Sequence, residues 1–174
     1  MRPILPFALS GLLLVSGGAL AQTTAAPQGQ PAPRLVIGAP GSCEMRVNGD
    51  PRPCSSGLVY VQHQDGAVLI SVQSGANVTI GFEGRSDSQP QRERYILDLA
   101  RMHTSVSGRS AAKQVTGSCE IEMSRDGRTW HRATCSATDR SNLTMIVTFT
   151  GNGSQVTAAR PGEAPAAAPR APKG

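Results

Sequence analysis

The chain has 174 residues, a formal net charge of +5, four cysteines and an aromatic content of only 3%. This length predicts one compact domain, because domains mostly hold about 100–200 residues. No hydrophobic run after the N-terminus approaches the roughly 18–20 apolar residues of a membrane-spanning helix, which excludes a multi-pass membrane protein. An apolar content of 39% argues against a chain that is disordered throughout.

Residues 1–21 have the features of a cleavable signal peptide. Arg2 supplies positive charge, Leu5 to Val15 forms a short apolar core, and Ala19-Leu20-Ala21 is a small-residue cleavage site before Gln22. We therefore expect a mature chain that begins near Gln22 and works in the periplasm or outside the cell.

Two Ala/Pro-rich segments flank the expected folded region. Residues 22–40 are rich in Ala, Pro and Gln, and residues 159–174 consist almost wholly of Ala, Pro, Arg and Gly. Neither can bury enough apolar surface to offset chain entropy, so we expect a disordered linker and a disordered basic tail. Within the linker, Leu35-Val36-Ile37 is a candidate for a short edge strand. The all-β domain is expected at 41–158.

Most of the positive charge is expected to lie in the flanking segments. Residues 41–158 hold twelve Lys and Arg against eleven Asp and Glu, a balance of +1. A nucleic-acid-binding face places its charge on the folded surface. We therefore expect no nucleic-acid partner, and only a weak attraction of the tails to anionic envelope polymers.

Apolar residues within 41–158 recur at every second position, which is the period of a half-buried antiparallel strand. The clearest alternation covers 68–72, 78–82, 95–99 and 143–149. No segment of the mature chain has a convincing helical pattern. The sequence therefore predicts an all-β fold, either a single antiparallel β-sandwich or a small partly open barrel, built from hairpins and carrying two disulfides.

An even cysteine count outside the cytoplasm indicates a disulfide framework. A two-residue turn of type I′ at Asn48-Gly49 sets Cys43 directly opposite Cys54. In that register Pro51 and Pro53 lie where no backbone N–H is needed. A hydrogen-bonded pair has Cα atoms about 5.5 Å apart, which a disulfide can span. The sequence therefore predicts a Cys43–Cys54 disulfide.

The other two cysteines, Cys119 and Cys135, flank another candidate hairpin. A two-residue turn at Asp126-Gly127 would set Cys119 opposite Thr134, one residue out of register, so pairing requires a β-bulge or a three-residue loop. Until this register is fixed, the face that carries Trp130 cannot be assigned. The two connectivities that join a cysteine of one hairpin to a cysteine of the other stay open.

A two-residue turn at Asp65-Gly66 is expected to join two strands that share one buried face. It pairs Val61 with Ile70 and Val59 with Val72, and it places His63 at the rim of that face. A loop at 74–76 then carries the buried face into the next strand, which contributes Val78, Ile80 and Phe82.

The candidate binding surface is a cluster of basic and aromatic residues near the tip of the third hairpin. An aromatic ring flanked by arginines suits stacking and anionic groups. Its members are Arg125, Arg128, Trp130, His131 and Arg132. In the alternative interpretation Trp130 lies in the core and Arg132 lies across the strands from Glu122.

No catalytic, cofactor or metal site is expected. The chain has no G-x-S-x-G, phosphate-loop or C-x-x-C motif, and its three histidines lack the spacing of metal ligands. An enzyme would be indicated if His63 or His103 lay in a cleft beside a carboxylate such as Asp98 or Glu83.

The expected function is that of a secreted or periplasmic binding or envelope structural protein, whose partner is an envelope or extracellular protein. The alternative is an inhibitor of an extracytoplasmic enzyme, a protease or a lysozyme. Such an inhibitor would use an exposed hairpin or the polar loop expected at 84–94, because loops on rigid scaffolds often carry function.

Overall fold

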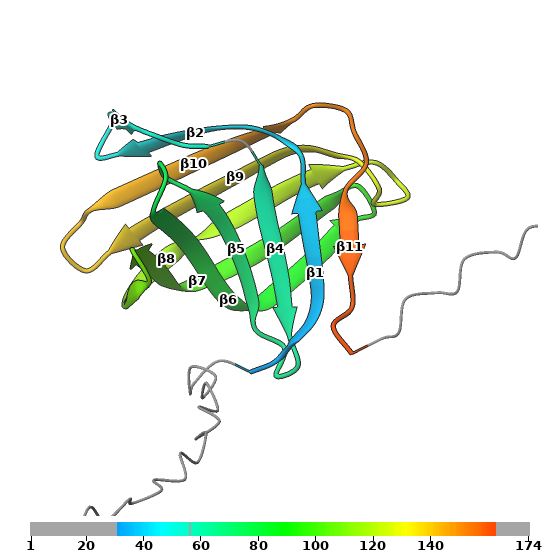
Figure 1. Ribbon diagram of the computed structural model, residues 1–174, viewed down its shortest axis with the longest axis horizontal. Coiled ribbons are helices and arrows are strands. Elements are labelled where there is room, and N and C mark those ends of the chain that lie inside the picture. The colour runs from blue at the N-terminus through cyan, green and yellow to red at the C-terminus, as the bar shows by residue number, and fades with distance from the viewer. Residues whose placement is uncertain (1–30, 56, 163–174) are drawn as a thin grey trace, which may run out of the picture. The chain divides into compact units, whose positions relative to one another are not determined.

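A computed structural model describes residues 31–55 and 57–162 (Figure 1). The expected signal peptide, its cleavage site and most of the C-terminal tail lie outside the described residues. Within them, the backbone forms strands and turns, and no helix is long and apolar enough to cross a membrane.

Eleven strands form one antiparallel sheet in the order β11-β1-β4-β5-β6-β7-β8-β9-β10-β2-β3. The strands are β1 (Pro33–Ala39), β2 (Gly41–Val47), β3 (Asp50–Arg52), β4 (Leu58–His63), β5 (Val68–Gln73), β6 (Val78–Gln91), β7 (Arg94–Val106), β8 (Arg109–Met123), β9 (Trp130–Asp139), β10 (Thr144–Gly151) and β11 (Thr157–Ala159).

The sheet curls because one segment bridges two distant parts of the strand order. Strands β1 and β2 are separated only by Pro40, yet β1 pairs with β4 and β2 pairs with β10 (Figure 1). The bridge at 33–47 therefore bends the sheet into a partly open barrel, with β11 and β3 as short edge strands. The all-β prediction is confirmed and the barrel alternative fits, whereas a sandwich is not formed.

Strand β1 corrects the predicted start of the folded region. Residues 33–39 belong to the sheet and are not part of a linker, and β1 has partners on both sides, β11 and β4. Leu35 and Ile37 pack against the core. The short apolar run in an Ala/Pro-rich context forms a strand because two neighbours satisfy its backbone and one face is covered. At the other end, β11 extends the sheet to Ala159.

The first hairpin matches its prediction. Asn48 and Gly49 have φ angles of 51° and 89°, which a type I′ turn requires, and Val47 lies opposite Asp50. The Cys43–Cys54 disulfide is present with its Cα atoms 5.6 Å apart. The disulfide thus closes the ladder just beyond the end of β3.

The hairpin between β4 and β5 differs from its prediction by one residue. Val59 pairs with Ser71 and not with Val72, because the connection has three residues, 64–66, closed by the His63 N–H donating to the Ala67 carbonyl at 2.8 Å. A one-residue slip turns a whole strand over. Leu58 and Tyr60 therefore face the core, while Val59 is 41% exposed. The continuation of the buried face into Ile80 and Phe82 is confirmed.

The segment 84–94, expected to be a polar loop, is the far half of a β-hairpin. Strand β6 continues to Gln91 and β7 begins at Arg94, so that only two residues form the turn. The side chains of 85–92 are all exposed. Without a buried face this arm has no apolar alternation, which is why the hydropathy pattern did not reveal it.

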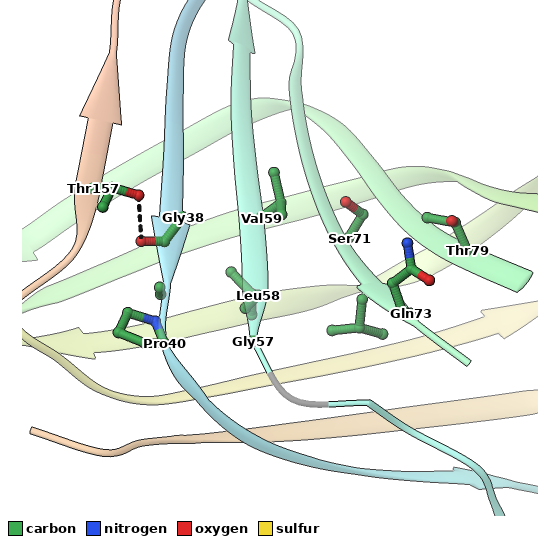
Figure 2. A pocket seen from close by; sticks show the side chains of 11 residues that line it. Gly38, Pro40, Gly57, Leu58, Val59, Ser71, Gln73, Thr79 and Thr157 are labelled. Atoms are coloured by element: carbon green, nitrogen blue, oxygen red, sulfur yellow. Dashed lines mark hydrogen bonds between the residues drawn. The ribbon is translucent and has the colours of Figure 1, made fainter. Parts of the chain in front are cut away.

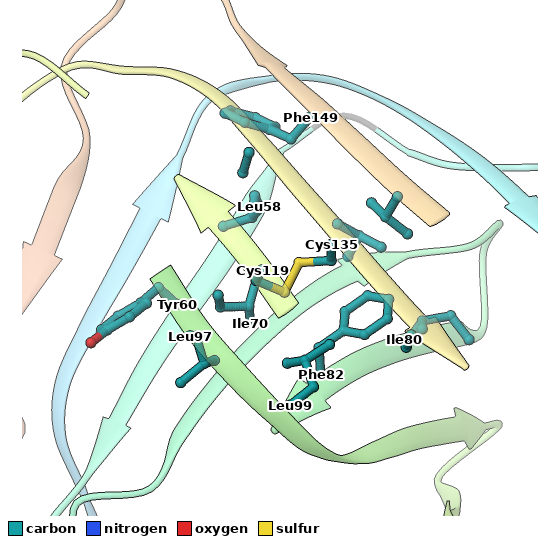
Figure 3. Packing of buried hydrophobic residues seen from close by; sticks show 14 of the residues in the cluster. Leu58, Tyr60, Ile70, Ile80, Phe82, Leu97, Leu99, Cys119, Cys135 and Phe149 are labelled. Atoms are coloured by element: carbon teal, nitrogen blue, oxygen red, sulfur yellow. A yellow bond between two sulfur atoms is a disulfide. The ribbon is translucent and has the colours of Figure 1, made fainter. Parts of the chain in front are cut away.

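Apolar side chains fill the interior of the barrel. Phe82, Phe149, Leu97 and the Cys119–Cys135 disulfide lie together at its centre, each with 0–1% exposure (Figure 3). The second predicted disulfide is therefore confirmed, and the described residues contain no free cysteine.

Candidate binding site

A β-bulge at the start of β9 turns Trp130 into the barrel. Cys119 pairs directly with Cys135, whereas Met123 pairs with Trp130, and the register shifts between Glu122 and Met123. This is the bulge that the disulfide register requires. Because of it Trp130 is only 4% exposed.

The five residues of the predicted basic and aromatic surface do not share one exposed face. Arg125, Arg128, His131 and Arg132 are exposed, while Trp130 lies in the core. The Arg125 Nε donates to the Glu93 carboxylate at 2.9 Å. The alternative interpretation therefore describes Trp130 correctly, and Arg132 lies opposite Glu122 as it proposed.

Trp130 lines a cavity of about 340 Å³ at one end of the barrel. The lining comes from the beginnings of β1, β7 and β9 and from the distal parts of β4, β6 and β8. Neighbouring antiparallel strands start and finish at the same edge, so these parts converge when the sheet curls. The apolar wall consists of Leu35, Ile37, Ile121 and Met123.

The aromatic part of this cavity uses the only tryptophan and both tyrosines of the chain. The ring of Tyr60 lies edge-on to that of Tyr95 and to that of Trp130, with centroids 6.0 Å apart in both pairs. The interplanar angles are 78° and 86°. Three rings on β4, β7 and β9 therefore stand at steep angles around one space. We call it the aromatic cavity.

Polar groups lie at the rim of the aromatic cavity. The Tyr95 hydroxyl donates to the Asp87 carboxylate at 2.8 Å. Burial raises the pKa of Tyr95, and the neighbouring Tyr60 and Asp87 raise it further. Burial also raises the pKa of Tyr60. Both phenols are therefore neutral at physiological pH. Gln62 and Gln89 complete the polar lining.

One buried donor beside this cavity has no acceptor. Among the described residues, the indole Nε1 of Trp130 is the buried side-chain polar atom without a hydrogen-bond partner. A buried donor that stays unpaired costs about 1–3 kcal/mol, and native structures keep few such groups. The nitrogen itself is buried, so it lies behind the cavity lining and is not offered to a ligand on the cavity surface.

A second polar cluster lies on the outer surface of the sheet. The His103 Nε2 lies 2.6 Å from the Glu83 Oε2, and the Arg101 guanidinium lies 3.9 Å from the other oxygen. His103 thus has the carboxylate neighbour that would indicate an enzyme, but neither residue lines the cavities described here. His63 contacts the Pro31 carbonyl instead, at 2.7 Å.

The described residues contain no group of three or more His, Cys, Asp and Glu side chains that could hold a metal ion. Another cavity, of about 330 Å³, is lined by residues of β1, β4 and β5 together with Thr79 of β6 and Thr157 of β11 (Figure 2). Backbone and small or neutral side chains line it, including Gly38, Val59, Ser71 and Thr157. It lacks the charged and aromatic groups of the aromatic cavity, which makes it the weaker candidate.

Asp139 organises the turn between β9 and β10 and is expected to make stability depend on pH. It accepts hydrogen bonds from the Lys113 ammonium at 2.6 Å and from the Ser141 hydroxyl and backbone N–H. These contacts, that with Lys113 foremost, lower the pKa of Asp139. A lowered pKa stabilises the fold above the unfolded-state value, about 3.9. This contribution is lost as the pH falls towards the folded-state pKa.

We therefore expect the free energy of unfolding to fall below about pH 4, and to fall less in Asp139→Asn than in the wild type. Urea unfolding between pH 7 and pH 2 measures this. Asp50→Asn is the matched control, because that carboxylate is 76% exposed. Equal pH dependence in all three proteins would contradict the prediction.

The chain matches no protein-family model, no curated protein and no solved structure.

Proposed function

We propose that this is a binding protein of the periplasm or the extracellular space, and that the aromatic cavity is its binding site. The lining of this cavity carries the proposal, because it joins the chain's only tryptophan and both tyrosines to a polar rim. The two disulfides support the compartment, because disulfides persist in oxidising environments and are rare in the cytosol.

The chemistry of the cavity defines the ligand. Binding pockets usually have volumes of about 300–1,000 Å³ and combine apolar walls with a few placed polar groups. The aromatic cavity has this size and this composition. Its walls are aromatic and apolar and its rim carries Gln62, Asp87 and Gln89, so the ligand carries an apolar body and polar groups that reach the rim.

Trp130→Phe tests the proposal. It keeps a ring in the core but removes part of the buried indole ring system, so we expect the free energy of unfolding to fall by about 1–3 kcal/mol. The wild-type chain, incubated with envelope extract and analysed by native mass spectrometry, is expected to retain a bound species. Trp130→Phe should retain about 10-fold less, because part of the aromatic wall of the cavity is lost.

The matched control is Val59→Ala, on the exposed face of β4, which should behave like the wild type. Equal retention by the wild type and Trp130→Phe would overturn the proposal, and so would the absence of any bound species.

A second candidate is an inhibitor of an extracytoplasmic protease or lysozyme. The β6–β7 hairpin favours it, because its exposed tip is held in place. The Gln89 amide donates to the Arg92 carbonyl at 2.9 Å, the Met123 N–H donates to the Glu93 carbonyl at 2.8 Å, and Arg125 binds the Glu93 carboxylate. A rigid tip loses little freedom on binding. A stable one-to-one complex with such an enzyme is expected, and its absence across a panel would contradict this candidate.

A further inference from the structure

Asp87 gives the aromatic cavity its charge. Among the described residues that line the cavity it is the one carboxylate, and the lining contains no lysine, arginine or histidine. The rest of the lining consists of the three aromatic rings, aliphatic and thioether side chains, two glutamines and a glycine. The cavity therefore sets a single negative charge against aromatic and apolar walls.

The Asp87 carboxylate has no cationic partner among the described residues, unlike acidic neighbours at the same end of the barrel. Asp65, Glu93 and Glu120 each bind an arginine side chain. Asp87 takes part in none of these ion pairs and accepts a hydrogen bond from the Tyr95 hydroxyl on one oxygen, Oδ2. An ionised carboxylate has about four lone-pair sites, so Asp87 keeps the capacity to bind a cation.

The charge of Asp87 also acts across the cavity. Burial is the main cause of the raised pKa of Tyr60 and of Tyr95, and the Asp87 charge adds to the rise in both. Arg34 acts on Tyr60 in the opposite direction and more weakly; its side chain is exposed and does not line the cavity. The negative charge at the rim therefore favours a cationic ligand.

The walls determine the kind of cation. A metal ion such as Ca²⁺ needs about six to eight oxygen ligands, which one carboxylate and two glutamine side chains do not supply. The faces of Trp and Tyr rings attract organic cations, and quaternary ammonium groups above all. A nitrogen that carries methyl groups in place of hydrogens also needs no acceptors from an apolar wall. Aromatic walls with one carboxylate therefore suit a methylated ammonium group.

We propose that the aromatic cavity binds a methylated ammonium group, which lies against the rings of Tyr60, Tyr95 and Trp130 while the Asp87 carboxylate balances its charge. This inference names the ligand class of the proposed function and rests on it. The same group is present in free small molecules such as choline and in the headgroup of phosphatidylcholine, so the experiment has an arm for each source.

The test compares choline with its uncharged analogue, in which a carbon atom replaces the nitrogen. Calorimetric titration of the full-length chain at fixed ionic strength should give a Kd for choline at least about 10-fold lower than for the analogue, because the two differ in charge and not in shape. Choline should also change the fluorescence of Trp130, the only tryptophan of the chain, which locates the bound cation in the cavity.

Asp87→Asn should weaken choline binding about 10-fold, while its amide oxygen can still accept from the Tyr95 hydroxyl. The matched control is Asp98→Asn, which removes the same charge from an exposed position of β7 outside the cavity lining. It should bind choline like the wild type. An equal loss in both variants would mean that net charge alone attracts choline, and it would overturn the proposal.

Cosedimentation with phosphatidylcholine vesicles, competed by free choline, would identify the lipid headgroup as the source; choline binding without vesicle binding would identify a free small molecule. No choline binding, or equal binding of choline and the uncharged analogue, would overturn the inference. If Trp130-dependent retention of an envelope species persists in that case, the proposed function stands without this inference; if that retention is also absent, both fail.

Discussion

Replacing Cys119 and Cys135 together by alanine is expected to lower the free energy of unfolding by about 3 kcal/mol or more. The bond closes a loop with a sequence separation of 16 residues, and a cross-link of that length restricts the unfolded chain by about 3 kcal/mol in the chain-entropy model. Both sulfurs also lie in the centre of the core (Figure 3), so their removal leaves a cavity, which adds to the loss.

The matched control is Cys43→Ala with Cys54→Ala. This bond has a separation of 11 residues, so its effect on the unfolded chain is similar. Its cysteines are only partly buried and lie beside the edge strand β3, so less core packing is lost. In guanidinium unfolding without reductant, the control should therefore have a higher free energy of unfolding than the Cys119/Cys135 variant. The opposite ranking, or equal stability, would contradict the prediction.

The hairpins show what local sequence can determine. At Asn48-Gly49 two residues that accept positive φ define the turn, and the register follows for every pair, including Cys43 with Cys54. At Asp65-Gly66 the same signal accompanies a three-residue connection. Strand β4 has apolar or aromatic residues at successive positions, so either alternate set can face the interior. The hydropathy pattern therefore does not decide whether Val59 or Tyr60 is buried.

The candidate site depends on long-range geometry. Tyr60, Tyr95 and Trp130 come from three strands that are not neighbours in the sheet, and they meet only because the bridge at 33–47 curls it. The prediction from sequence placed Trp130 with the arginines near it in the chain, because only neighbours along the chain can be identified without the fold. One signal was available: these three residues are all the Tyr and Trp that the chain has, and such residues often line binding sites.

Gly151→Ala is expected to be as disruptive as the loss of the buried disulfide. A Cβ at Gly151 would lie 1.8 Å from the Trp130 carbonyl oxygen and 3.0 Å from its carbonyl carbon. Backbone atoms cannot rotate away as a side-chain end can, so β9 must shift. We expect a loss of about 3 kcal/mol in unfolding free energy, at the upper end for overpacking. The tryptophan fluorescence should also change, because the displaced backbone carries Trp130.

Gly153→Ala separates this steric effect from the general cost of replacing a glycine. Gly153 has a φ of +85° and nothing within 4 Å of an added Cβ, so alanine costs only the left-handed conformation, about 1 kcal/mol. Its fluorescence should match the wild type. Substitutions at two glycines only two positions apart are thus expected to differ: Gly151→Ala changes the tryptophan fluorescence and Gly153→Ala does not. If Gly151→Ala were as stable as Gly153→Ala, the close approach of β10 to Trp130 would be contradicted, and with it the packing that holds the indole in the cavity.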